Sequence, residues 1–247
     1  MTTLKKIIFT IITIMNCSTA DGQILQLEPS IFNYPDLDAD TLSKYQALSD
    51  EYNRIIDEKI PYESLTEQQK TLFENELLHS EGPYFTGELG CSWYCATGPS
   101  SLTSTSQLES TKTINYKPEN AHDFDLRTSW VEGQEDYGIG EEIKIEFNLS
   151  SNLKVTHVNI FNGYSKSEKV WKENSRVKVF SLYVNGNLFG YLNLEDTYKK
   201  QQFDLGSLGG DENEKLVLTL RIIEVYKGDK YMDTAISEIN FDGTGDH

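Results

Sequence analysis

The chain has 247 residues, of which 38% are hydrophobic, a proportion that suits one or two globular domains rather than a disordered chain. It carries 39 acidic and 22 basic side chains, so its formal net charge at pH 7 is −17. A surface this acidic repels polyanions, which disfavours nucleic acid as a partner and contact with anionic membrane surfaces.

The first twenty residues have the pattern of an export signal. Two lysines precede the apolar run of residues 7–15, and a stretch of small polar residues ends at Ala20. Because the run is too short to span a bilayer, we predict a secreted, periplasmic or cell-surface chain that starts at Asp21 and has no transmembrane span. Cys17 leaves an alternative open, since a cysteine at this place can be lipidated in a bacterial lipoprotein.

Two helices are predicted in the N-terminal region, residues 21–96. Apolar side chains recur at helical spacing in residues 40–58, and Asp40 is a suitable N-cap. Ser64 and Glu67 have the spacing of a capping box, and a second apolar stripe follows them. We therefore expect a helical hairpin whose stripes pack on the protein itself, with partner binding as the alternative.

A short cysteine loop, GCSWYC, closes this region. Cys91 and Cys95 are the only cysteines besides Cys17, and pairing is the default expectation in an oxidising compartment. A metal site would need further soft or imidazole ligands, and none of the four histidines lies close in sequence. The sequence therefore favours a Cys91–Cys95 disulfide.

Residues 97–247 are predicted to form a β domain. The Ser/Thr-rich residues 96–113 come first, as either a linker or an irregular edge strand. Beyond them, apolar and charged residues alternate with the period of a half-buried strand, and turn sequences separate the segments. Many short strands without a long helix predict an antiparallel β-sandwich or jelly roll. The predicted strands are residues 143–147, 155–161, 177–179, 188–194, 201–205, 216–222 and 235–241.

The segment NAHDFDLRTSWVEG, residues 120–133, concentrates acids and a hydroxyl without a helical or strand period. Asp123, Asp125 and Thr128 stand at i, i+2 and i+5, which lets a curled loop aim several oxygens at one point, as calcium requires. The same residue types form ordinary turns by bonding to local backbone. Spacing alone leaves both interpretations open. Trp130 is expected to be a core anchor under this loop.

The segment FNGYSKSEKVWKENSRVKV, residues 161–179, is the predicted recognition segment. It combines aromatic faces with amide and guanidinium groups, which suits carbohydrate because a sugar ring has an apolar face and a rim of hydroxyls. The alternative is structural, with turn formation by the asparagine, ion pairing by the arginine and core packing by the tryptophan. The predicted ligand-binding residues are Glu132, Asn162, Tyr164, Trp171, Asn174 and Arg176.

Signatures of catalysis are weak. Several carboxylates lie between Glu132 and Glu142, and paired carboxylates can hydrolyse glycosides, but solvated surface acids are the commoner explanation in a chain this acidic. The sequence contains no nucleophile elbow, zinc-binding HExxH or phosphate loop, and GIGE at 138–141 is too short for a dinucleotide fingerprint. We therefore predict a protein that is not an enzyme.

Several motifs together resemble a known family. YKPENAHDFDLRTSWVEG, GIGEEIKIEF, NGYSKSEKVWKENSRVKVFSL and DTAISEINF occur in order within residues 97–242. They resemble the NADase-type glycan-binding domain, also described as the NAD glycohydrolase translocation domain, which is similar to discoidin modules of the galactose-binding-like group. The resemblance implies a β-sandwich with a structural calcium ion held by an Asp/Thr loop and a glutamate near the last strand. The matching positions are Asp123, Asp125, Thr128 and Glu238, and Phe124 stands where many related loops carry glycine.

Two functions follow from these observations. The first is a secreted, non-catalytic module that recognises a glycan through loops of a calcium-stabilised β-sandwich. The alternative is a protein-docking or envelope-scaffolding module with an envelope protein as partner and no glycan ligand. NAD hydrolysis is not implied, because the family resemblance assigns it to a separate region.

Overall fold

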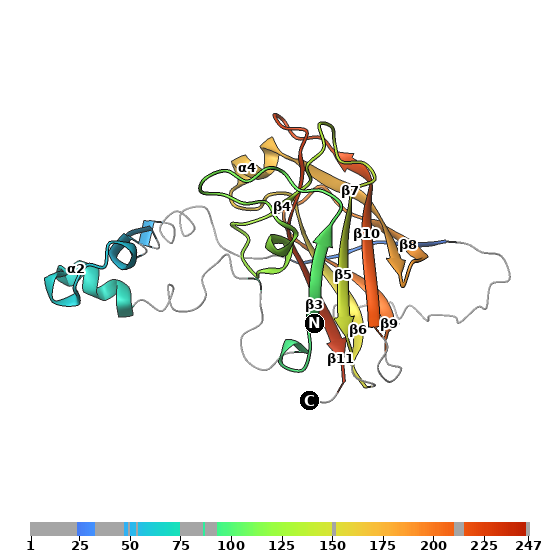
Figure 1. Ribbon diagram of the computed structural model, residues 1–247, viewed down its shortest axis with the longest axis horizontal. Helices are drawn as coiled ribbons and strands as arrows, with labels where there is room; N and C mark the ends of the chain where they lie inside the picture. Colours follow the sequence, from blue (N-terminus) through green and yellow to red (C-terminus); the bar gives the residue numbers. More distant parts are fainter. Residues whose placement is uncertain are drawn as a thin grey trace, which may run out of the picture.

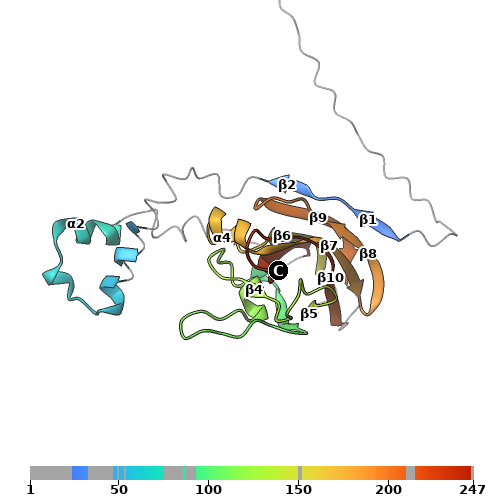
Figure 2. The ribbon, with the colours of Figure 1, turned by 90° about the horizontal axis from the view of Figure 1, so that it is seen from above.

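The computed structural model describes residues 24–32, 47–48, 50–52, 54–74, 86, 93–149, 152–209 and 215–245. Within these ranges the chain is mainly β, and its strands curl around one core (Figures 1 and 2). The predicted export signal, including Cys17, lies outside the described residues. No helix in the described ranges has the length and apolar character needed to cross a membrane.

Six of the seven predicted strands fall within an observed strand, and the seventh, 188–194, runs one residue past the end of β8 at Asn193. The agreement arises because period-two alternation places one face of each strand in the core. The edge-strand interpretation of the Ser/Thr-rich stretch is also correct, since β3 pairs with β5 along one side of the sheet. The strands are β1 (Leu25–Leu27), β2 (Ser30–Phe32), β3 (Pro99–Ser104), β4 (Trp130–Val131), β5 (Glu142–Asn148), β6 (Lys154–Asn162), β7 (Ser175–Val184), β8 (Asn187–Asn193), β9 (Lys200–Leu208), β10 (Lys215–Tyr226) and β11 (Thr234–Thr244).

The strands form two layers that face each other. One layer runs β1-β8-β7-β10-β5-β3 and the other runs β2-β9-β6-β11-β4. A short parallel pairing of β7 with β11, through Ser175 and Thr234, joins the layers. Phe147 of β5 meets Phe241 of β11 edge to face at 4.9 Å between ring centroids, which shows that both layers share the core. This arrangement confirms the predicted jelly-roll sandwich.

The first two strands close one side of the sandwich. β1 pairs in parallel with β8, and β2, three residues further along, pairs antiparallel with β9. Figure 2 shows this segment lying along the edges of both layers. Neither strand was predicted from the sequence, because a three-residue strand is too short to display a periodic pattern.

The helical residues 47–74 bury a small core of their own. Ile55, Leu65 and Leu72 are buried together, and Figure 1 shows this part beside the sandwich rather than inside it. Its short helices are η1 (Tyr62–Ser64), α2 (Glu67–Lys70) and η2 (Thr71–Glu74), preceded by helical residues at 47–48, 50–52 and 54–57. The predicted cap of the first helix, Asp40, lies outside the described residues.

The predicted capping box is wrong by two residues. Thr66, not Ser64, caps α2: its hydroxyl accepts from the backbone N–H of Gln69 at 3.2 Å, and the Gln69 side chain accepts from the Thr66 N–H at 2.9 Å. Ser64 instead ends a turn that begins after Pro61, and its hydroxyl donates to the Pro61 carbonyl at 2.7 Å. Ser64 with Glu67 and Thr66 with Gln69 both have the spacing of a capping box. Because the turn after Pro61 takes up Ser64, Thr66 is the residue that caps the helix.

Candidate functional site

The acidic loop, residues 120–133, is docked on the last strand through a helical turn at its start. The 3-10 helix η4 (Pro118–His122) begins with proline, whose missing N–H costs nothing at a first helical position. At its end, Nδ1 of His122 lies 2.8 Å from the carbonyl of Ile239 in β11. The Asn120 amide donates to the carbonyl of Ser129 at 3.1 Å and closes the loop on itself. The loop therefore has a fixed position against β11.

Phe124 takes the conformation that glycine adopts most easily. Its φ is 61°, in the left-handed region, which costs a residue with a side chain about 1–2 kcal/mol. Its ring packs edge to face on Tyr94 at 5.2 Å and against His122 at 5.1 Å, which offsets part of this cost. The loop thus keeps the backbone path that glycine permits, and the aromatic ring adds contacts outside it.

Two of the predicted metal ligands bind each other within the loop. The Thr128 hydroxyl donates to Oδ2 of Asp123 at 2.7 Å, and the backbone N–H of Asp125 donates to Oδ1 of Asp123 at 3.1 Å. Partial burial nevertheless raises the pKa of Asp123 above its usual value, because loss of water outweighs these bonds. The Asp123 carboxylate, one of the predicted calcium ligands, is therefore partly buried in an environment that disfavours its charge.

Glu238 lies inside the site. Its side chain is fully buried, and neither carboxylate oxygen has a hydrogen bond of good geometry within the described residues. Burial, and then the charge of Asp123, hold its pKa well above the usual range, while the nearby backbone N–H groups of Phe124 and Asp125 offset only part of this effect. A buried carboxylate without partners is costly unless a cation or a proton neutralises it.

The structure therefore brings Asp123, Thr128 and Glu238 together, as the resemblance implied, but it turns the Asp125 side chain elsewhere. The Asp125 carboxylate pairs with the Arg127 guanidinium through two bonds, Nε–Oδ1 at 2.8 Å and Nη2–Oδ2 at 2.7 Å. Its backbone carbonyl oxygen lies 3.1 Å from the Thr128 hydroxyl oxygen. The described residues contain no group of three or more His, Cys, Asp or Glu side chains placed to hold a metal.

The predicted recognition segment forms a connected framework at one end of the sandwich. Asn162 is fully buried, and its amide bonds both backbone groups of Val177, accepting from N–H at 3.0 Å and donating to the carbonyl at 2.7 Å. The indole N–H of Trp171, in helix α4 (Glu168–Glu173), donates to the Asn162 carbonyl at 2.8 Å. These contacts tie β6, β7 and α4 together. Asn162 thus has a structural role, but it bridges two strands rather than forming the turn weighed above.

Arg176 completes this framework. It is 6% exposed, and its guanidinium carbon lies 4.4 Å from the centre of the Trp171 ring. Nε and Nη2 donate to the Asp196 carboxylate at 2.8 and 3.1 Å, and Nη1 donates to the carbonyl of Asn174 at 2.8 Å. The Asn174 side chain in turn donates to the Val170 carbonyl at 2.9 Å and ends α4. Most of the donors of these side chains are thus used within the chain.

The remaining two predicted ligand residues, Tyr164 and Glu132, are buried as well. Tyr164 is nearly buried in a second apolar cluster with Val131. Glu132 is fully buried, and its carboxylate accepts from the backbone N–H groups of Gln134 at 2.7 Å and Thr234 at 3.1 Å. Burial raises the pKa of Glu132. Ligand binding by all six residues stays a prediction, and each has a structural contact in the fold.

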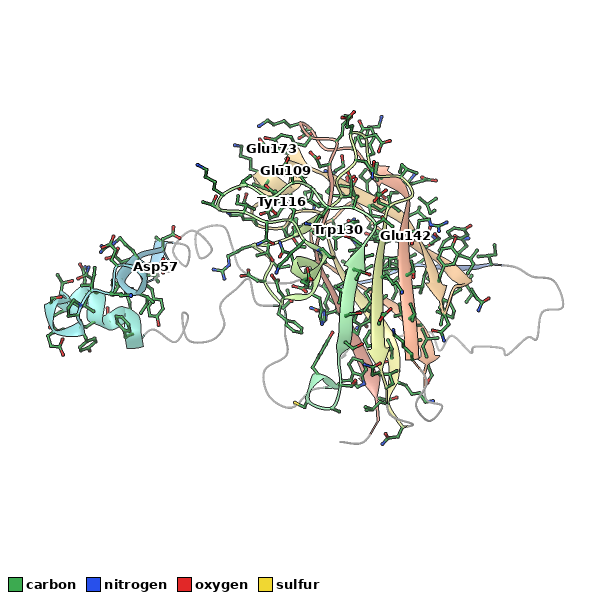
Figure 3. The ribbon with its side chains drawn as sticks, viewed as in Figure 1. Asp57, Glu109, Tyr116, Trp130, Glu142 and Glu173 are labelled. Carbon is green, nitrogen blue, oxygen red and sulfur yellow. The ribbon has the colours of Figure 1, made fainter. Side chains whose placement is uncertain are left out.

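Two exposed tyrosines beside α4 are not among the predicted ligand-binding residues; Tyr231 was expected to be structural. Tyr198 is 50% exposed, and its ring meets buried Trp171 edge-on at 6.0 Å. Tyr231 is 41% exposed and its backbone N–H donates to the Glu173 carbonyl at 2.8 Å. Figure 3 places Glu173 at the upper end of the sandwich, with Trp130 lower and inside. No spacing motif marked these tyrosines, which lie in irregular loops.

Trp130 is a core residue, as predicted. It is fully buried, and its indole N–H donates to the Ser106 carbonyl at 3.0 Å. The predicted disulfide cannot be placed, because Cys91 lies outside the described residues. Its predicted partner Cys95 ends the 3-10 helix η3 (Trp93–Cys95), which packs on the sandwich through the aromatic rings of Trp93 and Tyr94.

A two-layer jelly roll with an Asp/Thr loop docked beside a buried glutamate of the last strand defines a discoidin-like β-sandwich module. The family described as NAD glycohydrolase translocation F5/8 type C domain matches residues 93–242, and the chain belongs to this family. The match begins at η3, four residues before the predicted start of the β domain.

Comparison with curated proteins gave no match. Among solved structures, the chain is similar to the arabinofuranosyltransferase AftD from Mycobacteria, with 15% identity over 60% of this chain and 12% of that protein and a TM-score of 0.41. It is also similar to CBM32-3 from a family 31 glycoside hydrolase of Clostridium perfringens, with 14% identity over 60% of this chain and 95% of that protein and a TM-score of 0.40. A third similar structure is a putative chitobiase fragment from Bacteroides thetaiotaomicron, with 10% identity over 66% of this chain and 99% of that fragment and a TM-score of 0.36.

Proposed function

We propose that this protein is a secreted, non-catalytic module that binds carbohydrate through the loops around α4, on a β-sandwich stabilised by calcium. The family match over residues 93–242, which include β3 to β10 and most of β11, is the observation that carries the proposal. Secretion rests on the export-signal pattern of residues 1–20.

Exposed tyrosine rings make the α4 end suitable for a sugar. The Tyr198 ring meets Trp171 edge-on, and the backbone N–H of Tyr231 donates to the Glu173 carbonyl, so both residues are anchored to α4 while much of each side chain meets solvent. A fixed aromatic ring binds the apolar face of a sugar with little loss of side-chain entropy. Trp171 and Arg176 then support this surface rather than contact the ligand.

Calcium fits the residues beside Glu238. Calcium prefers oxygen ligands that mix carboxylate, hydroxyl and backbone groups, and here Asp123, Thr128 and Glu238 offer such oxygens while the Glu238 carboxylate lacks hydrogen-bond partners in the described structure. The Asp125 side chain is occupied by Arg127, so only its backbone carbonyl is expected to contribute. Calcium would neutralise the carboxylates and hold the loop against β11.

A glycan array tests carbohydrate binding. The mature chain, residues 21–247, is screened in calcium and in chelator beside Tyr198→Ala and Tyr231→Ala. Tyr62→Ala is the matched control, because Tyr62 is as exposed as Tyr198, at 51%, but lies in the helical part. We expect selective binding that both α4-end variants weaken and the control keeps. A folded wild-type protein that binds no glycan in calcium would refute carbohydrate binding.

A protein-docking function is the second candidate, and the helical part favours it. Residues 47–74 have their own small core and still expose Ile56 and Tyr62, each at 51%. A pull-down from the producing cell's envelope, with and without residues 40–81, separates the two functions. Partners that are lost with the deletion, together with an empty glycan array, would favour docking.

A further inference from the structure

Thr86 joins the two elements that make up the candidate cation site, although it precedes the matched domain by seven residues. Its backbone N–H donates to the carbonyl of Phe124, between Asp123 and Asp125, at 3.0 Å. Its hydroxyl oxygen accepts from the Asn240 amide of β11 at 2.9 Å. One residue from upstream therefore bridges the acidic loop and the strand that carries Glu238.

The Thr86 hydroxyl lies on the same side of β11 as Glu238. Residues at i and i+2 of a strand point to one face, so Asn240 and Glu238 are neighbours on that face. The hydroxyl is also close enough to Glu238 to favour its charged form. Because a threonine oxygen has two lone pairs and Asn240 uses one, the second is available to a cation beside the carboxylate.

A second upstream contact bridges the same two elements. The Tyr94 ring packs on Phe124 at 5.2 Å and on His122 at 5.6 Å, both in the acidic loop. Its hydroxyl accepts from the backbone N–H of Phe241, in β11, at 2.7 Å. The connection from the helical part thus meets the loop and β11 at two points, Thr86 and Tyr94.

We propose that Thr86 caps the cation site and that bound calcium thereby fastens the upstream connection, at Thr86 and η3, to the sandwich. This inference rests on the calcium site proposed above. Asp123 lies in the loop and Glu238 in β11, and Thr86 adds its hydroxyl oxygen where it bridges the two. With calcium, the same oxygens share one cation, and Thr86 links that cation to the chain leading to the helical part.

Calorimetry and hydrogen exchange on the mature full chain test the proposal. Calcium chloride is titrated into the wild type, Thr86→Val, Glu238→Gln and Thr103→Val. Valine keeps the shape of threonine without its oxygen, and Thr103 is an exposed residue of edge strand β3, which serves as the matched control. We expect about tenfold weaker calcium binding in Thr86→Val, no measurable binding in Glu238→Gln and unchanged binding in Thr103→Val.

Hydrogen exchange then separates capping from simple packing. At saturating calcium we expect slowed exchange in the acidic loop and in residues 93–98 of the wild type, but in Thr86→Val only the loop is slowed. Equal calcium affinity in Thr86→Val, or equal protection of residues 93–98, would overturn the inference and leave the calcium site standing. A wild-type chain that binds no calcium would refute the calcium site and this inference together.

Discussion

Arg176→Ala should destabilise the protein strongly, because Arg176 is built into the framework under the α4 end. The pair with Asp196 contributes about 1–2 kcal/mol after allowance for the carboxylate, whose side chain is 42% exposed and screened by water. Stacking on Trp171 at 4.4 Å adds about 1–2 kcal/mol. Loss of the buried side-chain stem adds about 1 kcal/mol. Together these terms predict a loss of about 3–5 kcal/mol in the free energy of unfolding.

Denaturant unfolding of Arg176→Ala, Asp196→Ala and the double variant measures this loss and isolates the ion pair. The cycle should give a coupling energy of about 1–2 kcal/mol between the two residues. Lys178→Ala is the surface control, since Lys178 pairs with Glu224 where both side chains are about half exposed. We expect this control to change the free energy of unfolding by less than about 0.5 kcal/mol.

A different pattern would refute the structural role of Arg176. If Arg176→Ala lost less than about 1 kcal/mol of stability and showed no coupling to Asp196, the framework would not depend on this side chain. Should that stable variant also lose glycan binding, Arg176 would be a ligand residue, as the sequence suggested.

Three further changes test other parts of the structure. Gly163→Ala should lower the free energy of unfolding by at least about 1 kcal/mol more than Gly186→Ala, as measured by denaturant unfolding. Both glycines have φ near +80°, but only a methyl group at Gly163 meets Arg176 and Trp171 within 3 Å. Equal losses would contradict the packing. Phe124→Gly should be more stable to unfolding than Phe124→Ala by about 1 kcal/mol, since both variants lose the ring and only glycine adopts the positive φ without strain. The reverse order would contradict the backbone strain at this position. Burial raises the pKa of Glu132, so its stabilisation is present below an unfolded pKa of about 4.3 and is lost as pH rises through the folded value. The stability of the wild type relative to Glu132→Gln should therefore fall as the pH rises above about 4.3, and a constant difference would argue against the burial effect.

The strands and the sandwich could be predicted from sequence because alternation reports directly which face of a strand is buried. Leu216, Leu218 and Leu220 all turn into the core, as their spacing predicted. The short edge strands β1 and β2 could not be predicted in this way, because their pairing depends on edges formed more than 150 residues later in the chain. Long-range pairing leaves no local periodic signal.

The site was predictable only in part, for two physical reasons. The meeting of Asp123 with Glu238 depends on docking of the loop on β11, and only the family resemblance supplied it. The composition around Trp171 and Arg176 suits a sugar platform and a buried framework equally well, because the same aromatic and hydrogen-bonding groups serve both. Burial, which sequence does not report, shows that both side chains belong to the framework.

Affinity electrophoresis through gels that contain soluble polysaccharides tests the central proposal most directly. The mature chain is run in calcium and in chelator, beside Glu238→Gln and a non-binding protein of similar size. We predict that at least one polysaccharide retards the wild type in calcium, and that retardation weakens in chelator and in Glu238→Gln. A folded wild-type chain that no polysaccharide retards would contradict carbohydrate binding as its function.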